Sequence, residues 1–524
     1  MPNRPTYLDH SAKSFFRFPD NNWLPIALLI IITFIALFPC LGLGFVWWDD
    51  QWYLLNNKAL DAFAHTWSWG AVHRFFVTSG YGNYIPLTMC TYAIEKYFFA
   101  PDPYLNPFLF HLDNVLLHIG CTLCVFFLFL QFNIKKWSSF MGALIFGIHP
   151  MRVESVAWVT ERKDVLYALF FLLALIAYVH SLKGKREVLW YFLAILCSLL
   201  ACFAKVQAVS LPLCLVAIDF YLKRKWYSPQ ILLYEKLPWW IFSLGFGLVN
   251  VNILKTQKIL GSAGMRMHYS LIDKLATGAW SYVVYIAKFI YPWQMQPYYP
   301  YPLHPPLIAY IFLVALPLSI VALLWWQRRN RSLIFGIIFF TCNIVFVLQI
   351  LSASDVFMVD RFTYVAYIGL CFLAAIAVNK AAESLPNTRL FLFSAIAIYI
   401  TFLCFLNGRQ VQVWQNTPSL WAHYNAANPT SYYGYGQLGG YYRSRALHKF
   451  WESFQPANDA YLVKLSVYNY SMALAKDSIN GCPIPQVTAR LYNERASMYI
   501  LSGLTEPAHN DSLKARHIMQ QPSH

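Results

Sequence analysis

Long runs of apolar residues, separated by short polar loops, dominate this sequence. A helix needs about 20 consecutive apolar residues to cross the hydrocarbon core of a bilayer, and runs near that length recur from Trp23 onward. The pattern predicts an all-α polytopic membrane protein with about eleven transmembrane helices. The expected spans are residues 23–47, 109–131, 136–151, 165–182, 188–204, 207–222, 237–254, 306–326, 332–351, 362–379 and 389–407.

Basic residues gather at every second loop, and this alternation sets the expected orientation. Cytoplasmic loops carry an excess of Lys and Arg, which places the N-terminus inside and the C-terminus outside. Residues 275–291 are apolar enough for a twelfth span, but that span would place the basic loop at residues 328–331 on the outer side of the membrane. They are therefore expected to form an amphipathic helix on the outer face. The basic clusters are Arg4, Lys13 and Arg17, then residues 135–136, 183–186, 223–225 and 328–331.

The composition agrees with a membrane protein. Only 12% of the 524 residues are charged and 58% are hydrophobic, whereas soluble chains carry about 25% charged residues. The net charge of +16 lies mostly in the short loops, so no nucleic-acid partner is predicted. The 11 Cys lack metal-type spacing and read as small core residues. The first apolar run is too long for a cleavable signal peptide and is expected to be a signal anchor.

Two adjacent carboxylates, Asp49 and Asp50, follow the first apolar run. Trp47, Trp48 and Trp52 flank them. A carboxylate beside apolar rings at a membrane boundary has a raised pKa and can act as a base near neutrality. On spacing alone, the start of an ordinary solvated loop explains the pair equally well.

A dense cluster of charges occupies residues 149–164, on the side predicted to be outside. Arg152, Arg162 and Lys163 run against the basic bias of cytoplasmic loops, and an anionic phosphate at the membrane interface would explain them. Internal salt bridges with the acids of the same segment are the alternative, and both are expected in part.

Three further sites carry polar groups near the predicted outer ends of spans. Asp360 and Arg361 begin the tenth span, where they can cap the helix or offer a guanidinium fork to phosphate. Lys205 lies between the fifth and sixth spans. His111, Asn114 and His118 share one face of the second span. Such a buried stripe is more often structural, and two His make a poor metal site, so no metal site is predicted.

Seven blocks, in order along the chain, resemble the family of transmembrane and tetratricopeptide-repeat-containing O-mannosyltransferases and their bacterial relatives. That family belongs to the GT-C glycosyltransferases. The resemblance covers roughly residues 45–410, and seven ordered blocks are far more specific than any single one. The blocks are Asp49-Asp50, residues 83–88, 111–118, 149–158, 162–164, 205–219 and 360–364.

The resemblance implies a glycosyltransferase that uses a polyprenyl- or dolichyl-phosphate sugar on the outer or lumenal face. The carboxylate pair of the family maps onto Asp49 and Asp50, with the first acid as the base and the second orienting the acceptor or the loop. Ile85 stands where animal members tend to have Arg, which bears on the donor sugar and the acceptor. The expected phosphate ligands are Arg162, Lys163, Lys205 and Arg361, with His111, Asn114, His118, His149, Arg152, Glu154 and Asp360 in support.

The expected partners are the lipid-phosphate sugar, membrane lipid, and a protein or glycan acceptor, with a Ser or Thr hydroxyl favoured. No cofactor is required, and a divalent cation is compatible with the scheme without being needed. The family and its bacterial relatives place the chain in a bacterial inner membrane, or in the endoplasmic reticulum of a eukaryotic cell. The C-terminal tail is expected outside the cytoplasm.

Two domains are expected. Residues 1–407 form the GT-C membrane domain, with outer loops at 48–108 and 255–305, and residues 408–524 form a soluble outer helical domain that packs against the second loop. Degenerate tetratricopeptide repeats are predicted in the tail from a 34-residue pattern, although a plain helical hairpin explains it nearly as well. The repeat positions are Tyr435, Leu438, Gly439 and Tyr442, then Tyr492, Ala496, Tyr499, Ala508 and Ala515.

Other functions remain open on the sequence. A polysaccharide or lipid-modifying glycosyltransferase or ligase also works on the outer face, but such chains place key Arg and His residues in a large late loop. A non-catalytic, repeat-bearing membrane scaffold fits if the carboxylates have no role. A transporter would place polar groups near the bilayer midplane, whereas here they lie at the outer ends.

Overall fold

The computed structural model describes residues 23–65, 69–77, 82–99, 106–183, 186–256, 269–350, 356–384, 389–447, 459–480 and 485–520. Helices make up almost all of this part of the chain, which confirms the all-α prediction. In the described residues a single antiparallel pair, β1 (Tyr299–Pro300) and β2 (Val356–Met358), forms a two-stranded sheet with Tyr299 opposite Met358. Arg4, Lys13, Arg17 and Lys185, from the predicted cytoplasmic clusters, lie outside the described residues.

The helices up to the middle of the chain are α1 (Trp23–Leu37), α2 (Lys58–His65), α3 (Trp69–Val77), α4 (Pro86–Phe99), α5 (Pro107–Gln131), α6 (Lys136–Ile148), α7 (Val153–Ala157), α8 (Arg162–Ser181), α9 (Glu187–Ala204), α10 (Leu211–Tyr221) and α11 (Leu237–Thr256). The later helices are α12 (Leu271–Ile290), α13 (Leu307–Trp326), α14 (Arg331–Ile344), α15 (Thr363–Ser384), α16 (Arg389–Val413), α17 (Thr417–Ala427), α18 (Tyr433–Ala446), α19 (Asp459–Asn480), α20 (Pro485–Leu501) and α21 (Thr505–Gln520). Short 3-10 or π turns join them: η1 (Phe38–Gly42), η2 (Gln51–Leu55), η3 (Pro150–Arg152), η4 (Val159–Glu161), η5 (Val206–Ser210), η6 (Gln230–Tyr234), η8 (Val345–Val347) and η9 (Asp360–Phe362).

Within the described residues, eight helical segments are long and apolar enough to cross a bilayer, so the chain is an integral membrane protein. Eight of the eleven predicted spans fall on these segments. They are Trp23–Gly42, Pro107–Gln131, Val159–Ser181, Glu187–Ala204, Leu237–Thr256, Leu307–Trp326, Asp360–Ser384 and Leu390–Val413.

The other three predicted spans are shorter helices. Residues 136–151 form α6 with 13 residues, residues 207–222 form α10 with 11, and residues 332–351 form α14 with 14. Pro150 opens the turn that follows α6, and 3-10 turns precede α10 and follow α14. None of these helices has the length that a lone span needs, so the count of eleven stays a prediction.

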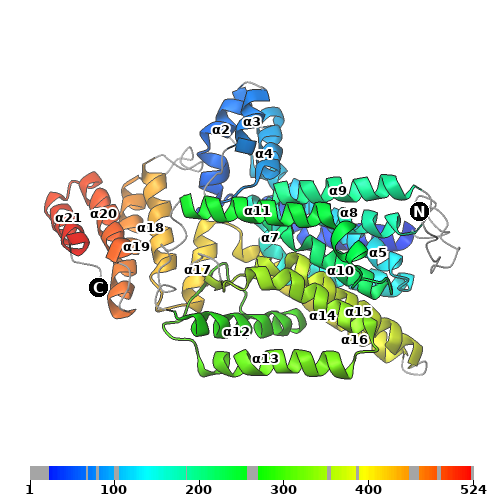
Figure 1. Cartoon of the computed structure of the whole chain (residues 1–524). Coiled ribbons are helices and arrows are strands. Elements are labelled where there is room, and N and C mark those ends of the chain that lie inside the picture. Colours follow the sequence, from blue (N-terminus) through cyan, green and yellow to red (C-terminus); the bar gives the residue numbers. More distant parts are fainter. Residues whose placement is uncertain are drawn as a thin grey trace.

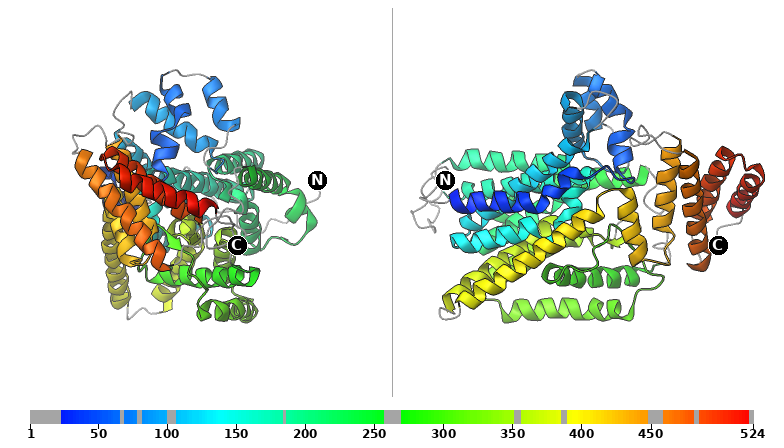
Figure 2. Two further views of the ribbon diagram at one scale, coloured as in Figure 1. Left: turned by 90° about the vertical axis from the view of Figure 1, so that its left-hand side faces the viewer. Right: turned by 180° about the vertical axis from the view of Figure 1, so that it is seen from behind.

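The long helices run side by side, and α18–α21 stack at one end of them (Figure 1 and Figure 2). The centre of the bundle contains the segment Val159–Ser181, where 78% of the most apolar 18-residue stretch is buried, against only 6% for the corresponding stretch of Leu307–Trp326. Because α13 is apolar all round, its exposed face suits lipid. Residues 275–290 are helical, which confirms the predicted helix up to its last residue, and α12 packs beside α13. The placement of α12 on the outer face stays a prediction.

Small residues allow α14 and α15 to approach closely. A Cβ atom added to Gly369 would lie 2.5 Å from the carbonyl oxygen of Gly336 and 2.9 Å from the backbone nitrogen of Phe340. Helix pairs in membranes use such positions because van der Waals packing, rather than hydrophobicity, holds them together. The Gly369 position therefore fixes the spacing of two central helices.

The tail consists of α17 to α21, and α18 with α19 and α20 with α21 form adjacent helix pairs (Figure 1). The expected contact with residues 255–305 is confirmed. The Tyr298 ring stacks on Tyr433 with 4.0 Å between centroids, and the Asn428 amide donates to the Gln296 side chain at 2.6 Å. Helix α16 continues past the expected domain boundary at residue 407 and ends at Val413.

We expect Gly369→Ala to destabilise the protein by about 1–3 kcal/mol, because the methyl group overpacks the contact between α14 and α15. Gly408→Ala is the matched control, since a Cβ there meets nothing within 4 Å and Ala is the better helix former. Thermal unfolding in detergent measures both. Equal midpoints for the two variants would contradict the role given to Gly369.

Candidate functional site

The acid pair of the first loop is held in place by the start of the tail. The backbone N–H of Gly44 donates to the carbonyl of Gln415 at 3.1 Å, and the N–H of Trp47 donates to the Thr417 hydroxyl at 2.8 Å. These bonds join residues far apart in the sequence. They anchor the irregular stretch between η1 and η2 from which the two acids project.

Four tryptophans pack around this stretch. Trp48 stacks on Trp158 with 4.6 Å between ring centroids, and Trp158 stacks on Trp414 at 5.4 Å. Trp421 of α17 meets the Trp48 ring edge-on at 5.2 Å. Because rigid aromatic pairs add packing energy beyond their buried area, the stack fixes the position of the residue directly before the acids.

Asp50 is buried, and the backbone occupies both of its carboxylate oxygens. Oδ2 accepts from the N–H of Val46 at 2.9 Å, and Oδ1 accepts from the N–H of Thr160 at 3.2 Å. Burial raises the pKa of Asp50 to about 7, although these N–H groups act to lower it. The carboxylate thus ties the first loop to η4 and has little freedom to turn toward a substrate.

Asp49 is half-buried, and the described residues form no hydrogen bond or ion pair with its carboxylate. Burial raises the pKa of Asp49 above the usual value for Asp, and the positive charge of Lys163 partly offsets this rise. A free carboxylate with a raised pKa suits a general base. The charges that act on it most strongly are those of Lys163, Glu161, Arg361 and Lys205.

Two of the expected phosphate ligands meet beside Asp49. Lys163, in the first turn of α8, pairs with Glu161 at 2.9 Å, and Lys205, directly after α9, pairs with Asp164 at 2.5 Å and with Glu161 at 3.5 Å. The acids are almost fully buried. The sequence predicted both lysines at the outer membrane interface, and in the fold both contact the carboxylate of Glu161.

Arg361 joins this cluster from η9. Its guanidinium contacts Glu154 at 2.5 Å and Glu161 at 3.2 Å, and its backbone N–H also donates to Glu154 at 3.0 Å. Burial raises the pKa of Glu154 to about 8, against the lowering effect of Arg361. The neighbouring Asp360 turns away and accepts from the Tyr299 hydroxyl at 2.9 Å.

Arg162 differs from the other expected phosphate ligands. Its guanidinium is fully buried, pairs with Glu95 through two nitrogens, and donates to the Asn114 side chain and the Phe110 carbonyl, both at 2.9 Å. A contact with the Thr91 hydroxyl at 3.5 Å completes the set. These contacts take up its N–H donors, because guanidinium has five. The Arg162 network therefore supports the fold around α4 and α5 and leaves no N–H for phosphate.

The expected supporting histidines are buried in helix contacts. His118 of α5 contacts the Tyr364 hydroxyl at 2.5 Å and the Gly147 carbonyl at 2.9 Å. His149 contacts the Phe289 carbonyl at 3.0 Å. Both rings pack among aromatic side chains, which fits structural roles. His111 is also fully buried on α5.

Arg152 is fully buried and lies among aromatic rings. Its guanidinium donates to the Thr363 hydroxyl and lies 5.1 Å from the ring centroid of Tyr364 and 5.0 Å from that of Tyr367. Such cation–π contacts compensate a desolvated guanidinium. Arg152 therefore links η3 to the start of α15, next to Arg361.

The sequence reasoning missed several polar partners. Glu95 completes the Arg162 network, and Lys288 of α12 contacts the Tyr299 hydroxyl at 2.5 Å and Asp360 at 3.5 Å. Each is a charged residue that is buried in a largely apolar helix, and a charge in such a stretch is the signal that could have flagged it. Their ionic partners, Arg162 for Glu95 and Asp360 for Lys288, lie far away in sequence, so no spacing rule could have paired these charges.

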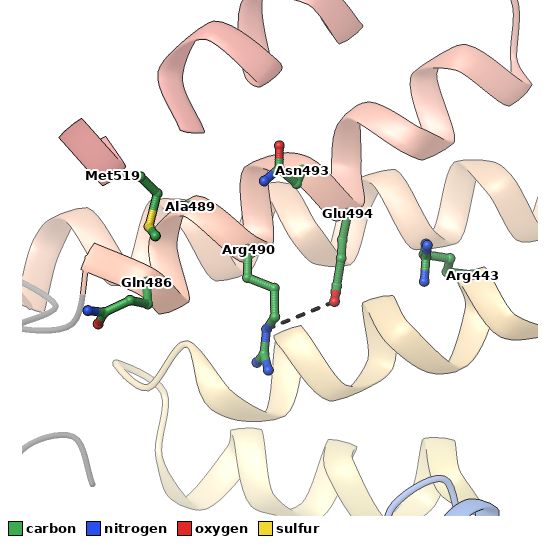
Figure 3. Close-up of a pocket in the computed structure, with 7 residues that line it drawn as sticks. All are labelled: Arg443, Gln486, Ala489, Arg490, Asn493, Glu494 and Met519. Carbon is green, nitrogen blue, oxygen red and sulfur yellow. Dashed lines mark ion pairs between the residues drawn. The ribbon is translucent and has the colours of Figure 1, made fainter. Parts of the chain in front are cut away.

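Two cavities are lined by residues other than Asp49 and Asp50. One, of about 320 Å³, is in the tail between α18, α20 and α21; Figure 3 shows Gln486, Arg490 and Asn493 among its lining, with Arg490 paired to Glu494 at 3.9 Å. The second, of about 600 Å³, is an apolar pocket between α3, α9 and α11. In the described part of the chain, no group of three His, Cys, Asp or Glu residues is placed to hold a metal ion.

The fold and this site define a class: an integral membrane protein with a free carboxylate beside a cluster of buried ion pairs. Comparison with known proteins supports the resemblance to the transmembrane and tetratricopeptide-repeat-containing O-mannosyltransferases. No protein-family model and no solved structure match the chain.

The matching relatives are protein O-mannosyl-transferases by name. The chain is 29% identical to human TMTC4 over 230 residues, which is 39% of this chain and 30% of that protein. It is 33% identical to human TMTC1 over 141 residues, 26% of this chain and 15% of that protein. It is 24% identical to F38B6.6 of Caenorhabditis elegans over 450 residues, 79% of this chain and 59% of that protein. The matches thus cover less than two thirds of each relative.

We expect Asp50→Ala to lower the free energy of unfolding by about 1–3 kcal/mol, because two buried backbone N–H groups lose their acceptor. Asp49→Ala should change it by less than about 0.5 kcal/mol, since the described residues give that carboxylate no bond to lose. Thermal unfolding of both variants in detergent tests the contrast. A larger loss for Asp49→Ala would show that the two roles are reversed.

Proposed function

We propose that this protein is a GT-C glycosyltransferase that moves a sugar from a polyprenyl-phosphate donor to a Ser or Thr hydroxyl of a protein on the outer or lumenal face. One observation carries the proposal. Asp49 is a half-buried acid without a partner among the described residues, beside three cations. The names of the relatives support a protein acceptor and make mannose the first sugar to test.

In the proposed reaction, the acceptor hydroxyl oxygen attacks the anomeric carbon of the donor sugar. The bond between that carbon and the phosphate oxygen breaks, and its electron pair leaves with the lipid phosphate. Asp49 takes the hydroxyl proton, a step that contributes about 10²–10⁴-fold when the base is well positioned. Asp50 holds the loop through its bonds to Val46 and Thr160.

Lys163, Lys205 and Arg361 are the proposed ligands of the donor phosphate. The leaving lipid phosphate carries more negative charge than the donor, so fixed cations stabilise the transition state. Arg162 is left out of this set because its donors are engaged elsewhere. This scheme uses no metal ion and does not exclude one.

The apolar pocket between α3, α9 and α11 is the proposed site for the lipid chain. Phe203, one of its lining residues, lies two positions before Lys205, so an isoprenoid there would bring its phosphate toward the cations. The tail contacts the segment that carries Asp49 and Asp50, through Thr417 and Trp421. Its position next to the acid pair favours transfer to a protein acceptor over a scaffold function.

The central test is transfer from a labelled polyprenyl-phosphate sugar by the purified protein. Asp49→Asn should bind donor normally and lose transfer by about 10²-fold or more, because the base is removed. Asp50→Asn serves as the comparison and should lose less. Full transfer by both single variants and the double variant would refute the assignment.

The pH dependence provides a second test. Asp49 must be ionised to accept a proton, and burial raises its pKa. The rate should therefore fall on the acid side with a midpoint above about 3.9, the ordinary pKa of Asp. Measuring kcat/KM against pH checks this. A midpoint at or below the ordinary value would contradict a buried Asp49 as base.

A further inference from the structure

One carboxylate, that of Glu161, touches all three proposed phosphate ligands. Its Oε1 lies 2.9 Å from Lys163 Nζ and 3.2 Å from Arg361 Nε, and its Oε2 lies 3.5 Å from Lys205 Nζ. The other acids of the cluster each hold one of these cations. Glu161 is therefore the only acid in the described cluster that all three share.

The three cations come from separate elements. Lys163 lies in α8, Lys205 follows α9, and Arg361 lies in η9. Like charges repel, and long cationic side chains lose rotamer freedom when they are held together. Glu161, only 1% exposed, offsets both effects. Lys163 Nζ and Arg361 Nε both contact Oε1 of Glu161, so this single oxygen keeps the two cationic groups close together.

We propose that Glu161 is a positioning residue that gathers Lys163, Lys205 and Arg361 into one phosphate-binding cradle. The inference rests on the proposed function, because it assumes that these cations meet a lipid phosphate. In this proposal Glu161 holds the three cations in place, and the cations themselves contact the phosphate.

The proposal opposes the simplest electrostatic expectation. Removing a negative charge next to an anion site should tighten anion binding if the cations keep their places. If Glu161 holds them in place, its neutralisation releases Lys205 toward Asp164 and Arg361 toward Glu154. The cradle then opens, and binding weakens despite the gain in positive charge.

A second network provides a matched control. Asp219 of α10 is also fully buried and bridges two cations, Arg224 at 2.8 Å and Lys236. Tyr178, which donates to it at 2.8 Å, lies 16 residues after Arg162 at the start of α8, or about 24 Å along the helix. Asp219→Asn removes the same kind of buried bridge far from the cradle.

The experiment measures binding of a short-chain polyprenyl monophosphate to the full-length protein in detergent. Glu161→Gln should weaken binding by about tenfold or more, since charge-assisted contacts are lost. Asp219→Asn should bind like the unchanged protein even if its unfolding midpoint falls. Glu161→Asp, which keeps the charge on a shorter side chain, should bind between Glu161→Gln and the unchanged protein.

Unchanged or tighter binding by Glu161→Gln would overturn the inference, and so would equal weakening by Asp219→Asn. If Glu161→Gln does not fold, Glu161→Asp decides, and binding equal to that of the unchanged protein refutes the positioning role. Failure of the unchanged protein to bind the monophosphate would instead refute the proposed function.

Discussion

The free-energy cost of burying a charged side chain in apolar surroundings is the constraint on which this structure depends. An ionised group taken out of water needs a partner or a functional reason. Around η4, buried cations are paired with carboxylates. Lys205, Arg361 and Arg162 each meet a carboxylate. Against that background the carboxylate of Asp49 differs, because it forms no hydrogen bond or ion pair with the described residues.

The start of the tail packs against the segment that carries the acid pair of the candidate site. Thr417 binds the backbone of Trp47, and Trp421 packs against Trp48, so α17 helps to hold the segment that carries the acids. Further along, Tyr433 stacks on Tyr298 of the neighbouring loop. Residues on the two sides of the predicted boundary at residue 407 are therefore in direct contact.

Stability and proposed chemistry use the same kind of interaction in different places. The Asp219 network contains Arg224, Lys236 and Tyr178. It joins α8 and α10 to the segment directly before α11. The Glu161 cluster has a similar composition, but the charges of its members act on Asp49, whose carboxylate has no bonded partner in the described part of the chain. A buried network with every partner satisfied fixes a structure, while one with an excess acid at its edge can also bind and release a proton.

The sequence by itself determined the all-α membrane class and eight of the long helices, because hydropathy and charge are local properties. It also singled out Asp49, Asp50, Lys163, Lys205 and Arg361 as candidate site residues, and their roles stay predictions. Tertiary structure alone decided which acids are free and which are engaged. Asp50 is bound by the backbone of Thr160, and Arg162 is taken up by Glu95. Those partners lie 110 and 67 residues away, and no pattern within one segment can specify a contact that exists only after distant helices pack.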